Sequence, residues 1–276
     1  MNSSIASKVA NKILNLTGHS NVEITIRGNT AIAAALSVFA EGDIILIPEE
    51  GGWLSYKTLP KKQGLQEIEV KCNDAVIDII DLQDKLLKLK PSAFLYENPG
   101  GYFAEQNAEE IYRICKENHC LVIMDVSGCI GTSLCKGDYA DIMVGSFGEW
   151  KLIEAHVGGF VSSNNLNLLN KMNLIKLSNN EDLKKINQKI DELPERIKSL
   201  LTIRKKVIAD LSSNGFSNNI IHPTGLGFVV VVAFSNEAEK EKLVSYCKEN
   251  ILEWTECPRY IRVNRKAISI EIKRIV

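Results

Sequence analysis

The chain is 276 residues long and carries 33 basic and 34 acidic side chains, a net charge of −1. This length allows one large domain and a smaller one, whereas a nearly neutral chain has no global field that attracts nucleic acid or an anionic membrane. No run of 18 apolar residues occurs, which excludes a membrane-spanning helix and favours a small-molecule ligand or protein contacts.

The first sixteen residues, MNSSIASKVANKILNL, predict an amphipathic helix. Lysines interrupt this segment, so it lacks the continuous apolar run of a secretory signal. The seven cysteines form no CxxC pair and no finger-like spacing with histidine. We therefore expect a cytoplasmic protein with reduced thiols, mostly in the core, and no metal site.

Apolar runs alternate with helical patterns through the first half of the chain. The predicted strands are VEITI (22–26), DIILI (43–47), QEIEV (66–70), SAFLY (92–96), CLVIM (120–124) and DIMVG (141–145). Helical patterns lie between most of them, and such alternation indicates crossover connections and a mostly parallel sheet. The sequence thus predicts a three-layer α/β large domain over residues 1–163.

A different pattern follows residue 163. Residues 164–213 are polar and helical, with a single proline at position 194. Next come FVVVVAFS (228–235), a helical pattern over 237–250, and the predicted strands RYIRV (259–263) and AISIEI (267–272). Residues 164–276 are therefore predicted to form a helical connection and a small α+β domain.

Ligands of parallel sheets bind beyond the carboxyl ends of the strands. After VEITI, residues Gly28, Asn29 and Thr30 open a helix whose N-terminus favours an anion, although a simple turn with a helix cap explains them equally well. After DIILI comes Trp53, either a flat face for stacking or a core residue.

Two further strand ends carry polar side chains. Asn98 follows SAFLY in a Pro-Gly-Gly turn, and Asp125 follows CLVIM. Lys151 lies in the connection between two predicted strands, YADIMV and FVSS. It is either a solvated loop lysine or an amine with a lowered pKa that forms a Schiff base with a carbonyl.

Taken in order, these residues resemble the fold type I pyridoxal-phosphate (PLP) enzymes, the aspartate-aminotransferase-like superfamily. The spacing S-F-x-x-x-K, here from Ser146 to Lys151, is followed by the pair Gly158 and Gly159. This spacing looks most like that of the DegT/DnrJ/EryC aminotransferases. The resemblance covers residues 22 to 163.

The resemblance implies a role for each of these residues. Lys151 is expected to carry the cofactor as a Schiff base and to move the substrate proton, and Asp125 to keep the pyridine nitrogen protonated. The remaining implied contacts are to the phosphate (Gly28, Asn29, Thr30, Ser146), the ring face (Trp53) and the phenolic oxygen (Asn98). The resemblance also implies a homodimer that takes an amino donor and a keto acceptor.

Substrate recognition is less clear from the sequence. Arg259 and Arg262 lie on a predicted strand of the small domain and suit either a substrate carboxylate or a surface salt bridge. Residues three apart in a strand point to opposite faces, so we expect at most one of them to face the cleft.

Transamination of an amino acid or amino sugar is the first expectation for the reaction. The same scaffold supports a PLP-dependent lyase or a sulfur or selenium transferase, for which Cys129 is a candidate sulfur carrier as well as an ordinary loop residue. The short segment before the first predicted strand leaves a non-catalytic, truncated relative as another alternative.

Overall fold

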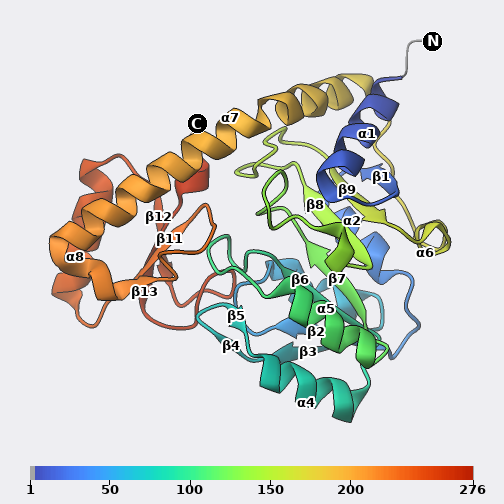
Figure 1. Cartoon of the computed structure of the whole chain (residues 1–276), viewed down its shortest axis with the longest axis horizontal. Coiled ribbons are helices and arrows are strands. Elements are labelled where there is room, and N and C mark those ends of the chain that lie inside the picture. Colours follow the sequence, from blue (N-terminus) through green and yellow to red (C-terminus); the bar gives the residue numbers. More distant parts are fainter. Residues whose placement is uncertain (1–3, 276) are drawn as a thin grey trace.

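The computed structural model describes residues 4–275, whose two main sheets are joined by one long helix (Figure 1). The larger sheet has the strand order β1-β9-β8-β7-β6-β2-β3. Its strands are β1 (Asn21–Thr25), β2 (Ile44–Pro48), β3 (Gln66–Val70), β6 (Ala93–Glu97), β7 (Leu121–Asp125), β8 (Ile142–Ser146) and β9 (Gly159–Ser163). Strands β3, β2, β6, β7 and β8 pair in parallel, and β9 runs antiparallel to β8 and β1. The predicted mostly parallel sheet is confirmed, with each predicted strand within one residue of its observed bounds.

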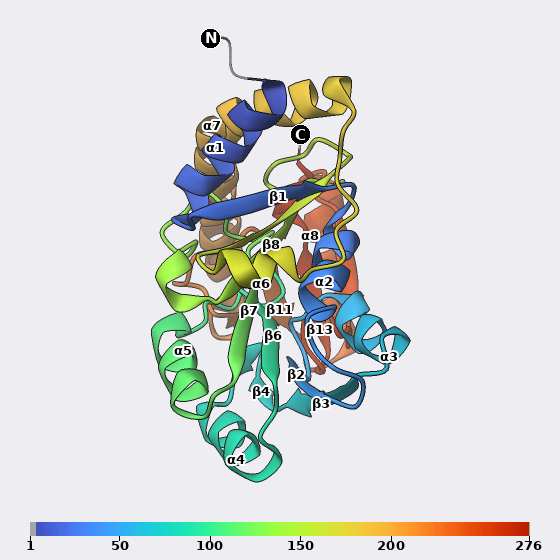
Figure 2. The same cartoon turned by 90° about the vertical axis from the view of Figure 1, so that its right-hand side faces the viewer.

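Helices cover both faces of this sheet (Figure 2). On one face lie α2 (Gly28–Leu36), η1 (Leu54–Lys57), α3 (Leu59–Lys62) and α6 (Leu166–Asn170); on the other lie α1 (Ile5–Thr17), α4 (Ile79–Leu89) and α5 (Ala108–Glu117). The strand residues alternate between the two apolar layers: Leu95 packs with the first set of helices, and Phe94 and Tyr96 with the second. The result is the expected three-layer domain.

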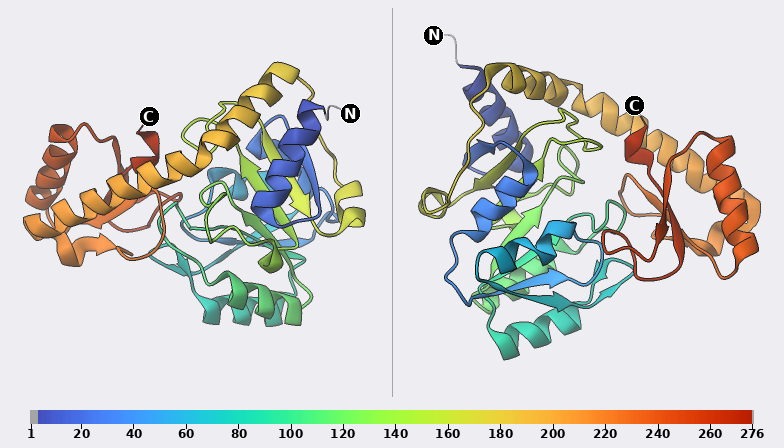
Figure 3. Two further views of the ribbon diagram at one scale, coloured as in Figure 1. Left: turned by 45° about the horizontal axis from the view of Figure 1, so that its top comes forward. Right: turned by 180° about the vertical axis from the view of Figure 1, so that it is seen from behind.

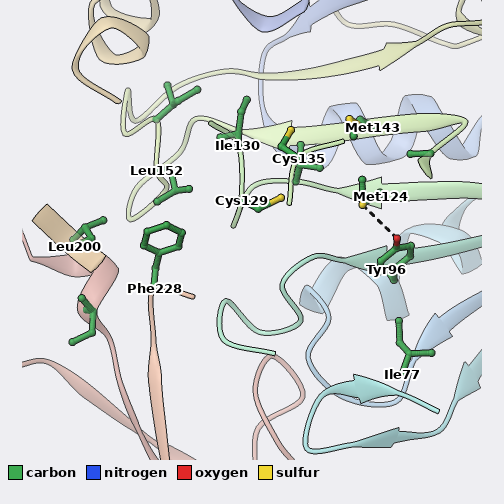
Figure 4. Close-up of a cluster of buried hydrophobic side chains, with 14 of the residues drawn as sticks. Ile77, Tyr96, Met124, Cys129, Ile130, Cys135, Met143, Leu152, Leu200 and Phe228 are labelled. Atoms are coloured by element: carbon green, nitrogen blue, oxygen red, sulfur yellow. Dashed lines mark hydrogen bonds between the residues drawn. The ribbon is translucent and has the colours of Figure 1, made fainter. Parts of the chain in front are cut away.

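One apolar cluster continues from the larger sheet into the C-terminal part of the chain. Tyr96 donates a hydrogen bond of 3.4 Å to the sulfur of Met124, and Cys129, Leu200 and Phe228 belong to the same cluster (Figure 4). Six of the seven cysteines are buried, as expected for core thiols. The C-terminal part therefore packs directly on the larger sheet.

The long helix α7 (Asn180–Leu211) runs along both parts of the molecule (Figure 3). Asn179 caps its N-terminus by accepting from the N–H groups of Glu181 and Asp182. The N-terminal half of α7 packs against α1, and buried residues such as Val207 continue along its C-terminal half. None of the helices within residues 4–275 has the length and apolar composition needed to cross a bilayer.

The smaller sheet is antiparallel with the order β10-β11-β13-β12, and helix α8 (Glu237–Glu249) packs against it. Its strands are β10 (Ile220–Ile221), β11 (Val230–Ala233), β12 (Trp254–Cys257) and β13 (Ala267–Ile270); a separate hairpin joins β4 (Cys72–Asn73) and β5 (Val76–Ile77). The predicted α+β character of this part is confirmed. The larger sheet's last strand ends at Ser163, and the division into separate domains there stays a prediction.

The predicted strand over residues 259–263 is wrong. These residues form a turn, which the N–H of Arg262 closes by donating to the carbonyl oxygen of Arg259 at 2.8 Å. Pro258 has no N–H to offer a neighbouring strand, so the β12 ladder ends just before it.

Candidate functional site

Two adjoining hollows lie where the carboxyl ends of β6, β7 and β8 meet the N-terminus of α2. The inner hollow, about 50 Å³, is lined by the larger sheet, α2 and the loop after β8. The outer cavity, about 510 Å³, extends from there to the C-terminal part of the chain. Six residues line both: Gly28, Asn29, Trp53, Glu97, Ser146 and Lys151. Both parts of the molecule thus build one site.

Lys151 lies in the loop between β8 and β9 and points into this site. Its ammonium nitrogen Nζ is 2.6 Å from the hydroxyl oxygen of Tyr102 and 4.8 Å from the ring centroid of Trp53. Burial lowers the pKa of Lys151, although the nearby carboxyl groups of Glu97 and Asp125 act in the opposite direction. The amine is therefore easier to deprotonate than that of a solvated lysine.

Asp125 is the last residue of β7 and lines the inner hollow, only 5% exposed. One carboxylate oxygen accepts from the N–H of Ser127 at 2.9 Å, and the other accepts from the hydroxyl of Tyr56 at 2.8 Å. These two bonds fix the orientation of the carboxylate. Asp125 is thus a rigid acceptor for a cationic donor.

Gly28, in the first turn of α2, packs directly against Ser146, and both residues line the hollow. A Cβ atom at Gly28 would lie 2.5 Å from the Cβ of Ser146, so only glycine permits this approach. The first N–H groups of a helix have no intrahelical acceptor, and here they adjoin the hollow that Gly28 and Asn29 line. This is the geometry of an anion site.

Thr30 does not line this site with its side chain. Its hydroxyl donates to the carbonyl oxygen of Arg27 at 2.6 Å and accepts from the backbone N–H of Arg27. These two bonds cap the N-terminus of α2. Neither hollow includes Thr30. Asn29 does line both, and its side-chain oxygen accepts from the indole N–H of Trp53 at 2.9 Å.

Asn98 is also not brought to the site. It lines a separate hollow, where its side-chain oxygen accepts from the N–H of Gln106, and its buried amide nitrogen has no hydrogen-bond partner. The preceding residue, Glu97, takes the expected position instead. Glu97 and Asp125 are register partners in parallel strands, so both side chains point to the same face, and Asn98 points away.

Sequence reasoning missed Glu97, although the chain carried a signal for it. Glu97 ends the apolar run AFLYE as Asp125 ends LVIMD. Burial and the neighbouring Asp125 raise the pKa of Glu97 to about 8, even though Lys151 acts to lower it. At neutral pH this carboxyl group is mostly protonated and can donate a hydrogen bond.

Both candidate arginines line the outer cavity, contrary to the expectation that at most one could. Because a turn replaces the predicted strand, the alternation of faces does not apply to them. Arg262 is 2% exposed, and its guanidinium bonds both carboxylate oxygens of Glu271, at 2.9 and 2.6 Å. Arg259 is partly exposed and has no ion-pair partner within residues 4–275.

Further residues of the outer cavity were not predicted, namely Arg27, Tyr102, Trp150, Lys273 and Arg274; His156, which also lines it, is exposed. Burial lowers the pKa of Lys273 to about 7, against the opposing effect of Glu271. Within residues 4–275 no group of three or more histidine, cysteine or acidic side chains is arranged to hold a metal ion. The lining of the outer cavity thus combines cationic side chains with the aromatic rings of Tyr102 and Trp150.

No family model and no curated protein matches the sequence. Solved structures do match the fold. A serine palmitoyltransferase from S. paucimobilis with bound PLP superposes with a TM-score of 0.72 at 15% identity, over 98% of this chain and 72% of that chain. An aminotransferase, TlmJ from Streptoalloteichus hindustanus, gives a TM-score of 0.78 at 12% identity, over 98% of this chain and 85% of that one.

A third similar structure is cystathionine gamma synthase from Xanthomonas oryzae pv. oryzae, with a TM-score of 0.64 at 18% identity, over 84% of this chain and 66% of that one. At such low identity these likenesses establish the fold. The expected fold class is confirmed: this is the architecture of the fold type I enzymes that the sequence resembles. What the chain does must be argued from its own site.

Proposed function

We propose that this chain is a PLP-dependent enzyme of the transferase type, with transamination of an amino acid or amino sugar as its reaction. The observation that carries this proposal is that Lys151 and Asp125 line the same inner hollow. A lysine of lowered pKa lies against the ring of Trp53, and a rigid carboxylate lies beside it at the end of β7. An amine nucleophile, an aromatic face and a fixed carboxylate suit a phosphorylated pyridine aldehyde.

The residues present fit this cofactor. The N-terminus of α2, whose residues Gly28 and Asn29 line both hollows beside Ser146, would hold the phosphate. Asp125 would hold the protonated pyridine nitrogen, and Trp53 would face the ring. Glu97, rather than Asn98, would donate to the phenolic oxygen, since it lines both hollows and its raised pKa favours the protonated form at neutral pH.

When bound, PLP supplies an electron sink for bonds at the amino-bearing carbon of the substrate. Lys151 would hold the cofactor covalently and then move a proton at that carbon, because its lowered pKa leaves a share of the amine neutral. Tyr102 would orient this amine through their 2.6 Å contact.

Transamination is favoured over sulfur transfer by the state of Cys129. This thiol is fully buried, and burial raises its pKa well above the usual value, so it is poorly suited to carry sulfur. The spacing from Ser146 to Lys151 supports the DegT/DnrJ/EryC branch in particular. Elimination by a lyase uses the same groups and is separated from transamination by its products.

A homodimer belongs to this proposal. Two large apolar side chains, Leu54 and Trp150, are exposed at the rim of the outer cavity, where a second copy would cover them. The near-neutral charge and free cysteines agree with the cytoplasmic location expected from the sequence.

The decisive experiment is borohydride reduction of the purified protein with PLP, followed by mapping of the labelled peptide. We expect the label on Lys151. Lys151→Ala should lose the reducible covalent bond and keep its circular dichroism spectrum, because the residue lies in a loop. The exposed Lys171→Ala is the matched control and should label as the wild type does. An unchanged reducible adduct in Lys151→Ala would disprove the assignment.

A further inference from the structure

The loop that carries Lys151, between β8 and β9, contains no helix and no strand. Leu152 and Ile153, directly after Lys151, are buried in the core. Glu149 and Trp150, directly before it, are exposed and line the outer cavity. Core packing therefore fixes the loop on only one side of Lys151. The position of its amine also depends on what holds the backbone on the other side.

Trp150, the residue before Lys151, has a left-handed backbone with a φ of 60°. A bulky residue keeps this conformation only where its surroundings impose it, because its Cβ crowds the following carbonyl oxygen. The Trp150 ring is 37% exposed, and its centroid is 4.1 Å from the guanidinium carbon of Arg274. The N–H of Trp150 donates to Oε1 of Glu154 at 2.6 Å. This bond holds the backbone directly beside Lys151.

Glu154 is itself fixed by the long helix α7. Its second carboxylate oxygen, Oε2, accepts from Nη2 of Arg196 at 2.8 Å, and the two side chains are only 13% and 19% exposed. An ion pair partly shielded from water is screened less than one on the open surface. The same Nη2 also donates to the backbone carbonyl oxygen of Lys273 at 3.1 Å. Arg196 therefore joins three segments: the loop of Lys151, α7 and the end of the chain.

We propose that Glu154 and Arg196 are positioning residues that hold the amine of Lys151 in the orientation from which it attaches the cofactor. Neither residue lines the inner hollow or the outer cavity, so both act through the loop. Tyr102 contacts the amine itself, whereas the pair of Glu154 and Arg196 fixes the backbone from which the amine projects. This inference rests on the proposed function, which assigns the covalent bond to Lys151.

The pair should act on the rate of covalent attachment more than on the affinity of the site. In the attachment step the nitrogen of the neutral amine bonds the aldehyde carbon of PLP, and the aldehyde oxygen leaves as water. Such a step is sensitive to the position of the nucleophile, since a displacement of about 1 Å can cost roughly 100-fold in rate. The proposed contacts to the phosphate and the pyridine nitrogen come from α2 and β7, which this loop does not carry.

The test measures two quantities on the whole chain. One is the rate of PLP attachment, followed by stopped-flow absorbance; the other is the affinity for pyridoxamine phosphate, which has an amine in place of the aldehyde and cannot bond Lys151. Glu154→Ala should attach PLP roughly 10- to 100-fold more slowly than the wild type and bind pyridoxamine phosphate equally well. Arg196→Ala should also slow attachment. Glu154→Gln should lie between, because its amide oxygen still accepts from Trp150 but forms no ion pair with Arg196.

A rescue variant separates positioning from a general loss of structure. Glycine adopts a left-handed backbone without strain, so Trp150→Gly added to Glu154→Ala should restore part of the attachment rate. Glu195→Ala, which removes an exposed carboxylate of α7, is the matched control and should attach PLP as the wild type does.

Three results would each overturn the inference. They are an unchanged attachment rate in Glu154→Ala, an equal loss of pyridoxamine phosphate affinity in that variant, and no recovery on adding Trp150→Gly. A wild type that attaches no PLP would overturn the proposed function and the inference with it, so the two failures are distinguishable.

Discussion

Three ionisable side chains of the site have pKa values moved toward neutrality, each for the same physical reason. Burial lowers the pKa of Lys151, lowers that of Lys273 to about 7 and raises that of Glu97 to about 8. Removing water disfavours the charged form of a base and of an acid alike. Lys273 and Glu97, whose pKa values are about 7 and about 8, exchange protons near neutral pH and are suited to acid–base chemistry.

Asp125→Asn should retain the covalent cofactor at Lys151 and lose most of the reaction. An amide accepts the bond from Ser127 but carries no charge to hold a pyridinium. We expect the rate of cofactor absorbance change with an amino acid donor to fall at least about 100-fold, as for other removed electrostatic stabilisers. The exposed Asp138→Asn is the control. Equal rates in Asp125→Asn and wild type would remove Asp125 from the mechanism.

Glu97→Gln tests the raised pKa of this carboxyl group through stability. The pKa of Glu97 is about 8 in the folded protein against an ordinary 4.5. Between pH 4.5 and 8 the unfolded chain therefore releases a proton that the folded protein retains, and the stability of the wild type falls as the pH rises. In the protein without cofactor, Glu97→Gln should gain about 1–4 kcal/mol relative to wild type between about pH 5 and about pH 9. Urea unfolding at both pH values measures this, with the exposed Glu241→Gln as control. A pH-independent difference would show that folding does not raise the pKa of Glu97.

The sequence located the strand ends of the site but not the direction of every side chain. Five of the predicted residues line the inner hollow: Gly28, Trp53, Asp125, Ser146 and Lys151. They could be predicted because each follows or ends an element whose position was clear from its apolar pattern. Successive side chains of a strand point to opposite faces of the sheet, so a shift of one residue changes the face. Glu97, and not Asn98, therefore shares the face of Asp125 and lines the site. A hydroxyl side chain near the start of a helix can bond the helix backbone instead of a ligand, and Thr30 does so by capping α2.

At the scale of elements, the ion pair between Arg262 and Glu271 joins the cavity turn to the end of β13. Although burial alone would raise it, the charges of Arg262 and Lys273 lower the pKa of Glu271 to about 2. This pair should stabilise the fold above pH 4.5, the ordinary value, and its contribution should be lost as the pH falls toward 2.

Arg262→Met should lower the free energy of unfolding by about 3–5 kcal/mol at neutral pH, because it removes the closest cation from a buried carboxylate that Lys273 and Arg274 approach only to 3.5 and 3.7 Å. The double variant Arg262→Met, Glu271→Met should recover part of this loss, since the two apolar groups need no partner, while Lys273 and Arg274 lose the carboxylate of Glu271. Urea unfolding of the wild type, both single variants and the double variant forms the complete cycle. Additive losses in the double variant would contradict a coupled pair.

The regular elements were predictable and the turn at residues 258–263 was not. Strands of the larger sheet are buried on both faces and therefore form continuous apolar runs, such as IILIP in β2. The segment RYIRV has the alternating composition of a strand as well, yet Pro258 precedes it and the backbone closes between Arg259 and Arg262. Local composition favoured the strand, and the connection required between β12 and β13 determined the turn.

At the scale of the whole molecule, the site depends on packing that no local pattern encodes. Lys273 reaches the cavity of Lys151 only because α7 carries the chain along the larger sheet and the smaller sheet folds back onto it (Figure 3). The shared core of Tyr96 and Phe228 fixes this arrangement. Fold class was therefore predictable from the sequence, whereas the cationic side of the cavity required the tertiary structure.

Leu54→Glu tests the proposed homodimer at the cavity rim. Leu54 is 53% exposed and lines the outer cavity beside Trp53, so a second copy covering the cavity would bury it. A charge placed there should shift the protein from dimer to monomer in light scattering and weaken cofactor retention, because the cavity would lie open to water. Ile80→Glu is the matched control: this residue is 81% exposed on α4, a helix that contributes no residue to the outer cavity, and should leave the dimer intact. A wild-type monomer that retains PLP and turns over an amino donor would rule out the dimer, and dissociation by Ile80→Glu alone would place the interface on the α4 face.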